Sequence, residues 1–279
     1  MSASEILSAS GRWILILKPN IIRKVLAANI QGFLQVRLTV FSLPHARQVW
    51  MLFQSLQHLF NLSQHSTMVL RAENLQKKYD RRCIFEQLSF ELRLGDSLAI
   101  QGANGSGKST LMRLLAGVST PTQGRITYLR HGQALEKTEQ IRYIGFVAPY
   151  LQFYDDLTGL ENVLFSLRAK GITPNLHQVE SLFEHFALAT ACRKFVRTYS
   201  SGMTQRLRFV HAFAAAPIVY LLDEPTVTLD RHGIALLWDY VAQQRPNIIL
   251  IVASNDADDI AQCQHRLCIE DFKPKVIYA

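Results

Sequence analysis

The segment Gly102-Ala-Asn-Gly-Ser-Gly-Lys-Ser-Thr110 decides how this chain is expected to fold. It matches the pattern GxxxxGK[ST], and it lies between a short apolar run, residues 97–101, and a helix-forming stretch, residues 108–116. Glycines let a backbone turn its N–H groups toward an anion, and the start of a helix adds the positive end of its dipole. The segment therefore predicts a strand, a phosphate-binding loop and a helix in succession.

Each part of this loop has an expected role. Lys108 is expected to reach the β- and γ-phosphates of a nucleotide, and the hydroxyl of Ser109 to be a ligand of Mg²⁺. The residues expected to contact phosphate are Gly102, Ala103, Asn104, Gly105, Ser106, Gly107, Lys108, Ser109 and Thr110. The loop alone does not distinguish a transport ATPase from a kinase or a GTPase.

An acidic pair, Asp223-Glu224, follows a second apolar run at residues 218–222. In α/β folds, ligands bind at the carboxyl ends of strands. We expect Asp223 to hold Mg²⁺, often through water, and Glu224 to polarise the water that attacks the γ-phosphate. Two carboxylates after an apolar run can also simply cap a strand. In combination with the loop at 102–110, however, they favour hydrolysis at the γ-phosphate of a nucleotide.

The charge of the chain is unevenly distributed. The formal net charge is +8, but residues 1–67 carry six basic residues and one acidic residue, so the remainder holds only +3. The net charge is therefore a weak argument for nucleic-acid binding, and no nucleic-acid partner is expected.

The cysteines and the apolar residues exclude two further classes of protein. Cys83, Cys192, Cys263 and Cys268 have neither CxxC spacing nor a zinc-type arrangement with histidines, so we expect reduced thiols. No run of 18 or more strongly apolar residues occurs, so a transmembrane helix is not expected, and any membrane-spanning partner is expected to be another chain.

The pattern of apolar residues and turn signals gives a coarse map of the elements. Strands are expected at 68–72, 88–92, 97–101, 218–222 and 247–253, with a further strand pair near 125–129 and 142–147. Helices are expected at 108–116, 163–170, 175–188, 202–215, 231–244 and 256–263, with Thr158 and Glu161 as a capping box ahead of the second. This order predicts an α/β core with a helical insertion.

The segment Tyr199-Ser-Ser-Gly-Met-Thr-Gln-Arg206 resembles the LSGGQ signature of ATP-binding cassette (ABC) proteins, and it precedes the acidic pair as in that family. The resemblance covers residues 68–279. It implies an α/β fold with a RecA-like P-loop NTPase core, an antiparallel β subdomain and an α-helical signature subdomain at about 150–216.

The resemblance also implies roles for further residues. Tyr79 stands where the family stacks an aromatic ring on adenine, and the segment 226–230, which ends in Asp230, resembles the D-loop. The implied assembly is a head-to-tail dimer, in which the signature segment of one subunit covers the γ-phosphate bound at Lys108 of the other. The signature residues are Ser200, Ser201, Gly202 and Met203. A serine hydroxyl and a helix start both favour an anion.

Two positions depart from the family pattern. Pro149 occupies the slot of the Q-loop glutamine, with Gln152 three residues beyond it, and proline cannot ligate Mg²⁺. Asn255 occupies the slot of the switch histidine; it can hydrogen-bond the γ-phosphate but cannot titrate near neutral pH. We therefore expect Glu224 to support hydrolysis that is slower than in a typical cassette.

Residues 1–67 have three interpretations. Their basic, acid-poor composition is typical of an organellar transit peptide. Alternatively, an apolar stripe within 49–60 could lie on a membrane. The interpretation we favour is an upstream extension that is not part of the native protein, with Met68 as the true start, because residues 68–279 have the length of a complete cassette.

The function that the resemblance implies is an ATPase subunit that binds MgATP and drives an exporter of the haem-export or multidrug type. Its expected partners are an integral membrane permease subunit and a second ATPase subunit, as a homodimer, on the cytoplasmic face of the membrane. Two alternatives remain: a nucleotide-gated regulatory cassette with little turnover, and a soluble cassette that acts on ribosomes or DNA. The paired cassettes or long coiled-coil insertion usual in the latter are missing from the sequence.

Overall fold

The computed structural model of the chain describes residues 4–7, 13–16, 68–80 and 82–274. The chain divides into two compact units, residues 1–61 and 62–279. In the first unit, strands β1 (Ser4–Leu7) and β2 (Trp13–Ile16) pair antiparallel. The apolar stripe within residues 49–60 lies outside the described residues.

A parallel sheet forms the centre of the second unit. Its strands are β5 (Ser97–Gln101), β8 (Ile144–Val147), β9 (Val219–Asp223), β10 (Ile249–Ala253) and β11 (His265–Cys268), in the spatial order β11-β5-β10-β9-β8. Strands β9 and β10 are buried along their whole length, which explains why both read as continuous apolar runs in the sequence. Since all five strands are parallel, the loops at their carboxyl ends meet at one edge.

A second sheet is antiparallel. It contains β3 (Met68–Tyr79), β4 (Arg82–Arg93), β6 (Gln123–Arg130) and β7 (Gln133–Ala134), in the order β4-β3-β6-β7. The expected strands at 68–72 and 88–92 are thus parts of a much longer hairpin. Irregular positions such as Asn74 and Gln87, which have positive φ, coincide with shifts in the pairing register. Because these polar positions interrupt the alternation of apolar and polar residues, the full length of the hairpin could not be predicted from that alternation.

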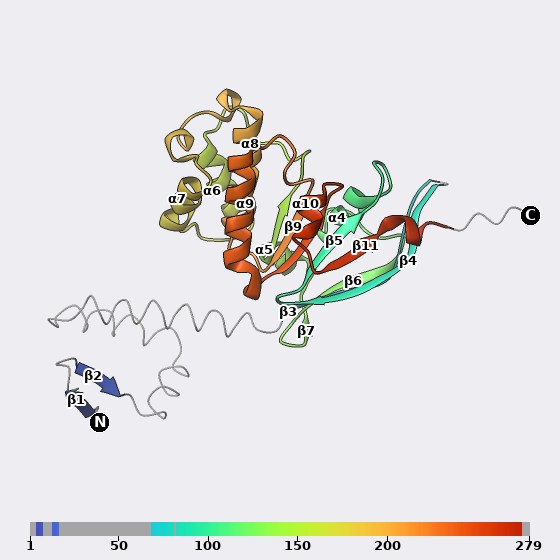
Figure 1. Cartoon of the computed structure of the whole chain (residues 1–279), viewed down its shortest axis with the longest axis horizontal. Helices are drawn as coiled ribbons and strands as arrows, with labels where there is room; N and C mark the ends of the chain where they lie inside the picture. The colour runs from blue at the N-terminus through green and yellow to red at the C-terminus, as the bar shows by residue number, and fades with distance from the viewer. Residues whose placement is uncertain (1–3, 8–12, 17–67, 81, 275–279) are drawn as a thin grey trace, which may run out of the picture. The chain divides into compact units, whose positions relative to one another are not determined.

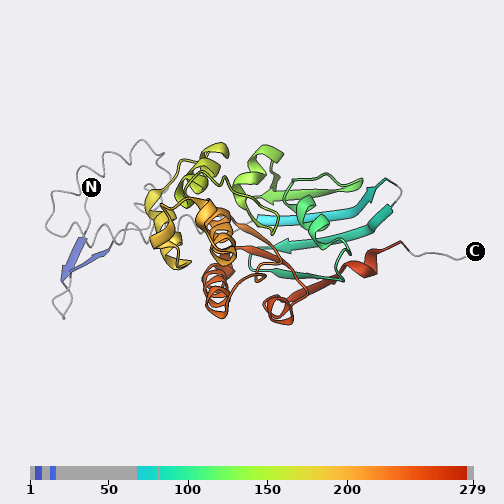
Figure 2. The ribbon, with the colours of Figure 1, turned by 90° about the horizontal axis from the view of Figure 1, so that it is seen from above.

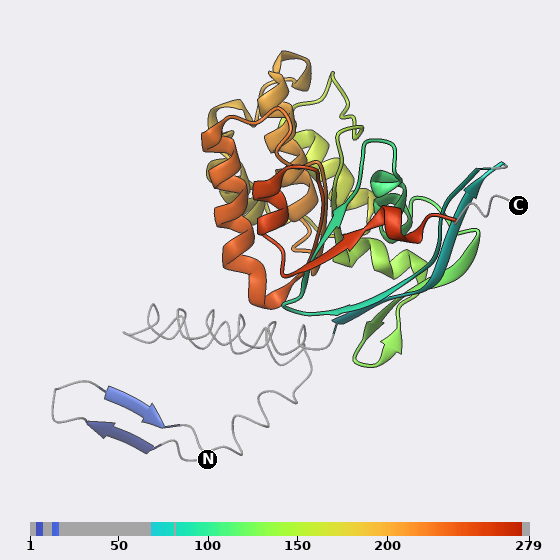
Figure 3. The ribbon, with the colours of Figure 1, turned by 45° about the vertical axis from the view of Figure 1, so that its right-hand side comes forward.

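Helices cover the parallel sheet and form one end of the unit. They are α4 (Lys108–Leu115), α5 (Lys137–Tyr143), α6 (Gly159–Ala169), α7 (Leu176–His185), α8 (Ser201–Phe213), α9 (Arg231–Gln244) and α10 (Ala257–Ala261), with short 3-10 turns η1 (Ala189–Ala191), η2 (Val196–Thr198), η3 (Arg245–Asn247) and η4 (Ile269–Phe272). Figures 1 and 2 show α6, α7, α8 and α9 gathered at one end, with the long strands β3, β4 and β6 at the other. Strand β11 and η4 extend from the parallel sheet toward β4 (Figure 3).

The predicted strand pair near 125–129 and 142–147 is wrong as a pair. Strand β6 lies in the antiparallel sheet beside β3, whereas β8 lies in the parallel sheet beside β9. Residues 142 and 143 belong to α5, and β8 begins only at Ile144. The error has a physical cause: a short apolar run indicates a strand, but its pairing partner is chosen by tertiary packing.

Most other helix predictions hold to within a few residues. Helix α6 begins at Gly159 rather than at 163, directly after its N-cap Thr158, and the predicted capping box with Glu161 is present. None of the helices in residues 68–80 and 82–274 has the length and apolar character that crossing a lipid bilayer requires.

The signature helix α8 is fixed against the parallel sheet by close backbone packing. A Cβ atom on Gly145 of β8 would lie 2.7 Å from the carbonyl oxygen of Ala212 in α8. Only glycine allows this approach. The buried side chains of Leu207, Phe209 and Phe213 join those of β9 and β10 in one apolar cluster. Helix α8 is therefore held next to the strand that ends in the acidic pair.

Candidate nucleotide-binding site

The loop 102–110 connects β5 to α4 and is shaped by three glycines. Gly102, Gly105 and Gly107 have φ values of 149°, 76° and 120°, which residues with a side chain rarely adopt. A Cβ atom on Gly102 would lie 2.6 Å from the hydroxyl oxygen of Ser106. That hydroxyl is buried and has no hydrogen-bond partner within the described ranges. The loop is thus a cradle with a polar group left over for a ligand.

The side chain of Lys108 is held at the centre of the site. It is 6% exposed, and its Nζ donates to the carbonyl oxygen of Gly102 at 2.7 Å and to Oδ1 of Asn255 at 3.1 Å. Nζ also lies 3.7 Å from Oε1 of Glu224. A buried ammonium with acceptors from three different segments is an anchor point for a phosphate that enters between them.

Ser109 and Asp223 form the candidate metal-binding pair. The hydroxyl of Ser109 donates to Oδ1 of Asp223 at 3.2 Å. The second oxygen, Oδ2, is buried and has no hydrogen-bond partner in the part of the chain that the structure describes. The pKa of Asp223 is raised to about 6, mainly by burial and in smaller part by the charge of Glu224, while the Ser109 hydroxyl, Lys108 and Arg113 oppose the shift.

A divalent cation fits this pair. At pH 7 the Asp223 carboxylate is ionised at an energetic cost, since burial disfavours its charged form. Mg²⁺ prefers carboxylate and hydroxyl oxygens, and a cation bound there would relieve that cost. The orphaned oxygen and the hydroxyl therefore match the donor set that the sequence predicts.

Glu224 and Asn255 lie beside Lys108 at the ends of adjacent strands. Glu224 has a φ of 47°, and its backbone N–H donates to the carbonyl oxygen of Ala253 at 2.8 Å, which joins the ends of β9 and β10. The side-chain amide of Asn255 donates to Oδ1 of Asn104 at 2.8 Å. Asn255 therefore bridges the phosphate loop and Lys108, in the position where the family resemblance expects a residue that contacts the γ-phosphate.

The signature segment lies apart from Lys108 along the chain but borders the same groove as Glu224. Ser200 is the exposed N-cap of α8, and its hydroxyl accepts from the N–H of Met203 at 3.2 Å. Ser201 is exposed, and Gly202 lies close enough to the 226–230 segment that a Cβ atom would be 3.4 Å from the carbonyl oxygen of Thr228. The signature segment therefore forms an exposed helix N-terminus, which favours an anion.

Two other predicted residues make local contacts. Tyr79, at the end of β3, is 45% exposed, and Nζ of Lys77 lies 4.8 Å from the centroid of its ring. Asp230 is the N-cap of α9, where its carboxylate accepts from the N–H of Gly233 at 2.7 Å. Tyr79 thus presents a partly exposed ring, whereas the carboxylate of Asp230 already has a structural partner.

The loop after β8 carries a proline at position 149, where the family pattern expects a glutamine. Pro149 is exposed and lines a groove with Glu224 and Thr204, whereas Gln152 lines a different cavity. The neighbouring Tyr150 ring lies 5.5 Å from the guanidinium carbon of Arg113. Burial and the charge of Asp223 raise the pKa of Tyr150 to about 12, so its phenol remains protonated at neutral pH.

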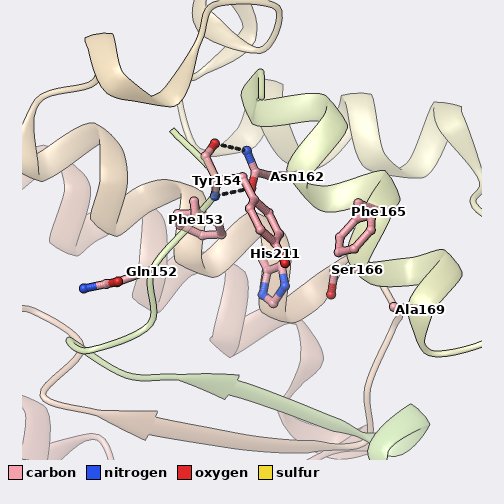
Figure 4. A pocket seen from close by; sticks show the side chains of 8 residues that line it. All are labelled: Gln152, Phe153, Tyr154, Asn162, Phe165, Ser166, Ala169 and His211. Atoms are coloured by element: carbon pink, nitrogen blue, oxygen red, sulfur yellow. Dashed lines mark hydrogen bonds between the residues drawn. The ribbon is translucent and has the colours of Figure 1, made fainter. Parts of the chain in front are cut away.

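The cavity lined by Gln152 lies between the 152–154 loop, α6 and α8 (Figure 4). It has a volume of about 190 Å³, and the rings of Tyr154 and Phe165 meet edge-to-face at its rim, 61% and 51% exposed. At its base, Nδ1 of His211 has no hydrogen-bond partner among residues 68–80 and 82–274. Burial lowers the pKa of His211 to about 4, so the ring is neutral at pH 7. The cavity combines an apolar rim with one polar group at the base.

The comparisons with known proteins agree with this geometry. The family model described as "ABC transporter" matches residues 85–227, which is just over half of the chain. The chain belongs to the ABC transporter family. The fold class predicted from the sequence is confirmed, since solved ABC ATPase structures share it.

Relatives of this ABC chain include ATP-binding proteins of an import system and of a lipoprotein-releasing system. It is 36% identical over 210 residues to a sulfate/thiosulfate import ATP-binding protein of Rhizobium meliloti, covering 72% of this chain and 57% of that protein. It is 32% identical over 207 residues to a lipoprotein-releasing system ATP-binding protein of Hydrogenovibrio crunogenus, covering 68% of this chain and 89% of that protein. A solved ATP-binding subunit of an ABC transporter matches with a TM-score of 0.64 and 26% identity, covering 72% of this chain and 85% of that one.

Two residues at this ABC site, Glu270 and Arg113, were not predicted from the sequence. Oε1 of Glu270, in η4, accepts from the N–H of Ala103 at 2.7 Å, and this hydrogen bond lowers the pKa of Glu270. Arg113 donates to the carbonyl oxygen of Ser109 at 3.1 Å and packs on Tyr150. In the sequence, Glu270 is marked only as an acidic residue that follows the apolar run at 267–269. Ala103 lies 167 positions away, so no local pattern connects the two residues.

Proposed function

We propose that residues 68–279 are the nucleotide-binding domain of an ATPase subunit that hydrolyses MgATP and drives export through a separate integral membrane subunit. The observation that carries this proposal is the convergence of Lys108, Asp223, Glu224 and Asn255 at the ends of the neighbouring strands β5, β9 and β10. The subunit would lie on the cytoplasmic face of the membrane. Export, rather than import, rests on the resemblance of the signature and of the segment at residues 147–163 to exporter-type subunits.

The residues have distinct roles in this reaction. The loop N–H groups and Lys108 bind the β- and γ-phosphates, Ser109 and Asp223 hold Mg²⁺, and Glu224 accepts a proton from the attacking water. When bound, Mg²⁺ supplies positive charge that neutralises phosphate oxygens. Asn255 donates a hydrogen bond toward the γ-phosphate from the position where it now bridges Lys108 and Asn104. Tyr79 stacks on the adenine.

A head-to-tail homodimer would complete the site. Within one chain, Ser200 and Ser201 are exposed at the start of α8, and among the described residues the Ser200 hydroxyl bonds to the N–H of Met203 in its own helix. The helix start and the serine hydroxyl form an anion-binding end, which in the proposed dimer covers the γ-phosphate bound to the other copy.

The experiment that tests the proposed function is steady-state phosphate release from the purified full-length chain, compared with the Asn255→Ala variant. We expect slow, Mg²⁺-dependent release from the native chain and a roughly tenfold lower rate in the variant, since losing one hydrogen bond to developing charge costs about 1.5–3 kcal/mol. The exposed neighbour Asp258, changed to Asn, serves as the control. Release at a typical family rate that is unchanged in Asn255→Ala would contradict slow turnover and the role of Asn255.

The cavity beneath Tyr154 and Phe165 is the proposed contact for the membrane subunit. Its aromatic rim suits an apolar side chain at the end of a helix, and it lies on the loop that leads from β8, whose end also borders the groove of Glu224. The side chain of Asn162 fixes this loop by hydrogen bonds to the backbone N–H and carbonyl of Tyr154 and to the carbonyl oxygens of Leu157 and Thr158. A displacement of this loop by the membrane subunit would therefore be transmitted to the groove of Glu224 through a short, ordered segment.

The Phe165→Asp variant is expected to weaken association with the membrane subunit about 30-fold or more, because the loss of an aromatic interface anchor costs about 2 kcal/mol or more. The measurement is co-purification, at several concentrations, with a candidate membrane subunit that is chosen by searching the neighbouring coding sequences for a membrane protein. Val118→Asp is the matched control, since Val118 is 65% exposed and lies outside the cavity. Equal binding of both variants would exclude this surface as the contact, while ATP turnover of the isolated chain should not change.

A further inference from the structure

A buried carboxylate outside the predicted site connects the two segments that carry Glu224 and Asn255. Asp259, in α10, is 1% exposed. Its Oδ2 accepts two hydroxyl hydrogen bonds: from Thr226 at 2.8 Å and from Ser254 at 2.9 Å. Thr226 lies two residues after Glu224, and Ser254 lies directly before Asn255. One oxygen atom of Asp259 therefore ties the turn after β9 to the turn after β10.

The hydroxyl of Ser254 also lies near Glu224. Its Oγ is 3.4 Å from Oε2 of Glu224, and it accepts from the N–H of Asp256 at 3.0 Å. A serine hydroxyl has one proton to donate, and the shorter of its two acceptor distances is to Asp259. Asp259 therefore fixes the orientation of Ser254 and, with it, the side-chain environment of Glu224.

The backbone at Glu224 needs such support. Its positive φ is unfavourable for a residue with a long side chain, and such strain persists only where surrounding contacts hold it. On the strand side, the N–H of Glu224 donates to Ala253. On the other side, the next anchored side chain is that of Thr226, which Asp259 holds. The hydrogen bonds of Glu224 to Ala253 and of Thr226 to Asp259 thus lie on the two sides of the turn that orients the Glu224 carboxylate.

If Asp259 only filled space in the core, a carboxylate would not be needed at this position. Burial raises the pKa of Asp259, and the hydroxyls of Thr226 and Ser254 oppose this shift. The nearby carboxylates of Asp256 and Glu224 raise it further. A buried carboxylate that costs stability, and that has both of its partners in the reacting segments, indicates a positioning role.

We propose that Asp259 is a positioning residue for ATP hydrolysis, which holds Glu224 and Asn255 in a fixed relation through Thr226 and Ser254. This inference rests on the proposed function, because it takes Glu224 to be the residue that accepts the proton. Asp259 touches neither nucleotide nor metal in this proposal. It acts through the two hydroxyls.

The test is the full-length Asp259→Asn variant, compared with Asp258→Asn, the same substitution at the exposed neighbouring residue. We expect the turnover number to fall tenfold or more and ATP affinity to change less than twofold, because a small displacement of a catalytic group slows the reaction without removing the phosphate contacts. Ser254→Ala should also lower turnover, and the double variant should be no slower than the worse single variant.

A second measurement does not depend on turnover. Hydrogen exchange of the nucleotide-free chain should become faster in residues 224–230 and 254–256 of Asp259→Asn, and should be unchanged in residues 102–110. Thr226→Val, which removes one donor and keeps the carboxylate, should give the same pattern more weakly. If the native chain hydrolyses no ATP, the proposed function fails, and the exchange pattern alone decides whether Asp259 holds the two segments.

Three results would overturn the proposal. One is native turnover and native exchange in Asp259→Asn. Another is a parallel loss of ATP binding and turnover with faster exchange throughout residues 82–274, which would make Asp259 a general stabilising residue. The third is full additivity of the Ser254→Ala and Asp259→Asn effects, which would mean that the two side chains act independently.

Discussion

Replacing Glu224 by glutamine is expected to lower ATP turnover by roughly 10²–10⁴-fold while ATP binding is retained. Glutamine has nearly the same shape, so the strained turn at position 224 and the hydrogen bond from its N–H to Ala253 should persist. The amide cannot accept the proton of the attacking water, however. It also removes the negative charge that now lies 3.7 Å from Nζ of Lys108, which should favour a bound phosphate.

The measurement combines single-turnover phosphate release with light scattering in the presence of MgATP. The Glu224→Gln variant should accumulate ATP-bound dimers, whereas the native chain should pass through them. Glu139→Gln, on the exposed face of α5, is the control. Identical trapping in the native chain and in Glu224→Gln would indicate that turnover was never significant, and would favour a nucleotide-gated regulatory cassette.

Replacing Lys108 by methionine is expected to weaken ATP binding about 100-fold or more. Methionine keeps much of the buried stem but loses the ammonium, and the loss of one partner of a buried charged contact costs about 2–5 kcal/mol. The acceptors that Nζ now joins, Gly102 and Asn255, are then left without their cation. Turnover should fall with binding, unlike in Glu224→Gln.

Calorimetric titration of ATP into the nucleotide-free chain measures this effect directly. Lys137→Met changes an exposed lysine at the start of α5 and should bind ATP normally. Thermal unfolding of both variants shows whether the chain remains folded. Unchanged ATP affinity in a folded Lys108→Met variant would mean that the 102–110 loop is not the phosphate site.

Local patterns predicted the elements that carry the chemistry because their signals are short-range. The glycines within residues 102–107 indicate the backbone conformation of the loop at their own positions. The apolar runs before Asp223 and Asn255 indicate that β9 and β10 are buried. The helix predicted at 231–244 has these bounds in the structure, where the side chain of Asp230 caps its first turn.

Long-range pairings could not be predicted in this way. The hairpin of β3 and β4 contains irregular positions that break its alternation, and β6 and β8 were paired with each other although they belong to different sheets. Which strand lies beside which depends on the packing of side chains that are distant in the sequence.

The sequence by itself was enough to predict a phosphate-binding loop, an acidic pair and a signature segment, because these predictions depend on residue types at fixed spacing. Only the tertiary structure decided that β10 lies between β5 and β9, and so brought Asn255 against Lys108. It alone joined Thr226 and Ser254 through Asp259 and set Glu270 against the loop. The hydrogen bonds of Thr226 to Asp259, of Lys108 to Asn255 and of Ala103 to Glu270 join residues that are 33, 147 and 167 positions apart. They leave no periodic trace in the sequence, since they form only when the parallel sheet brings the strand ends together.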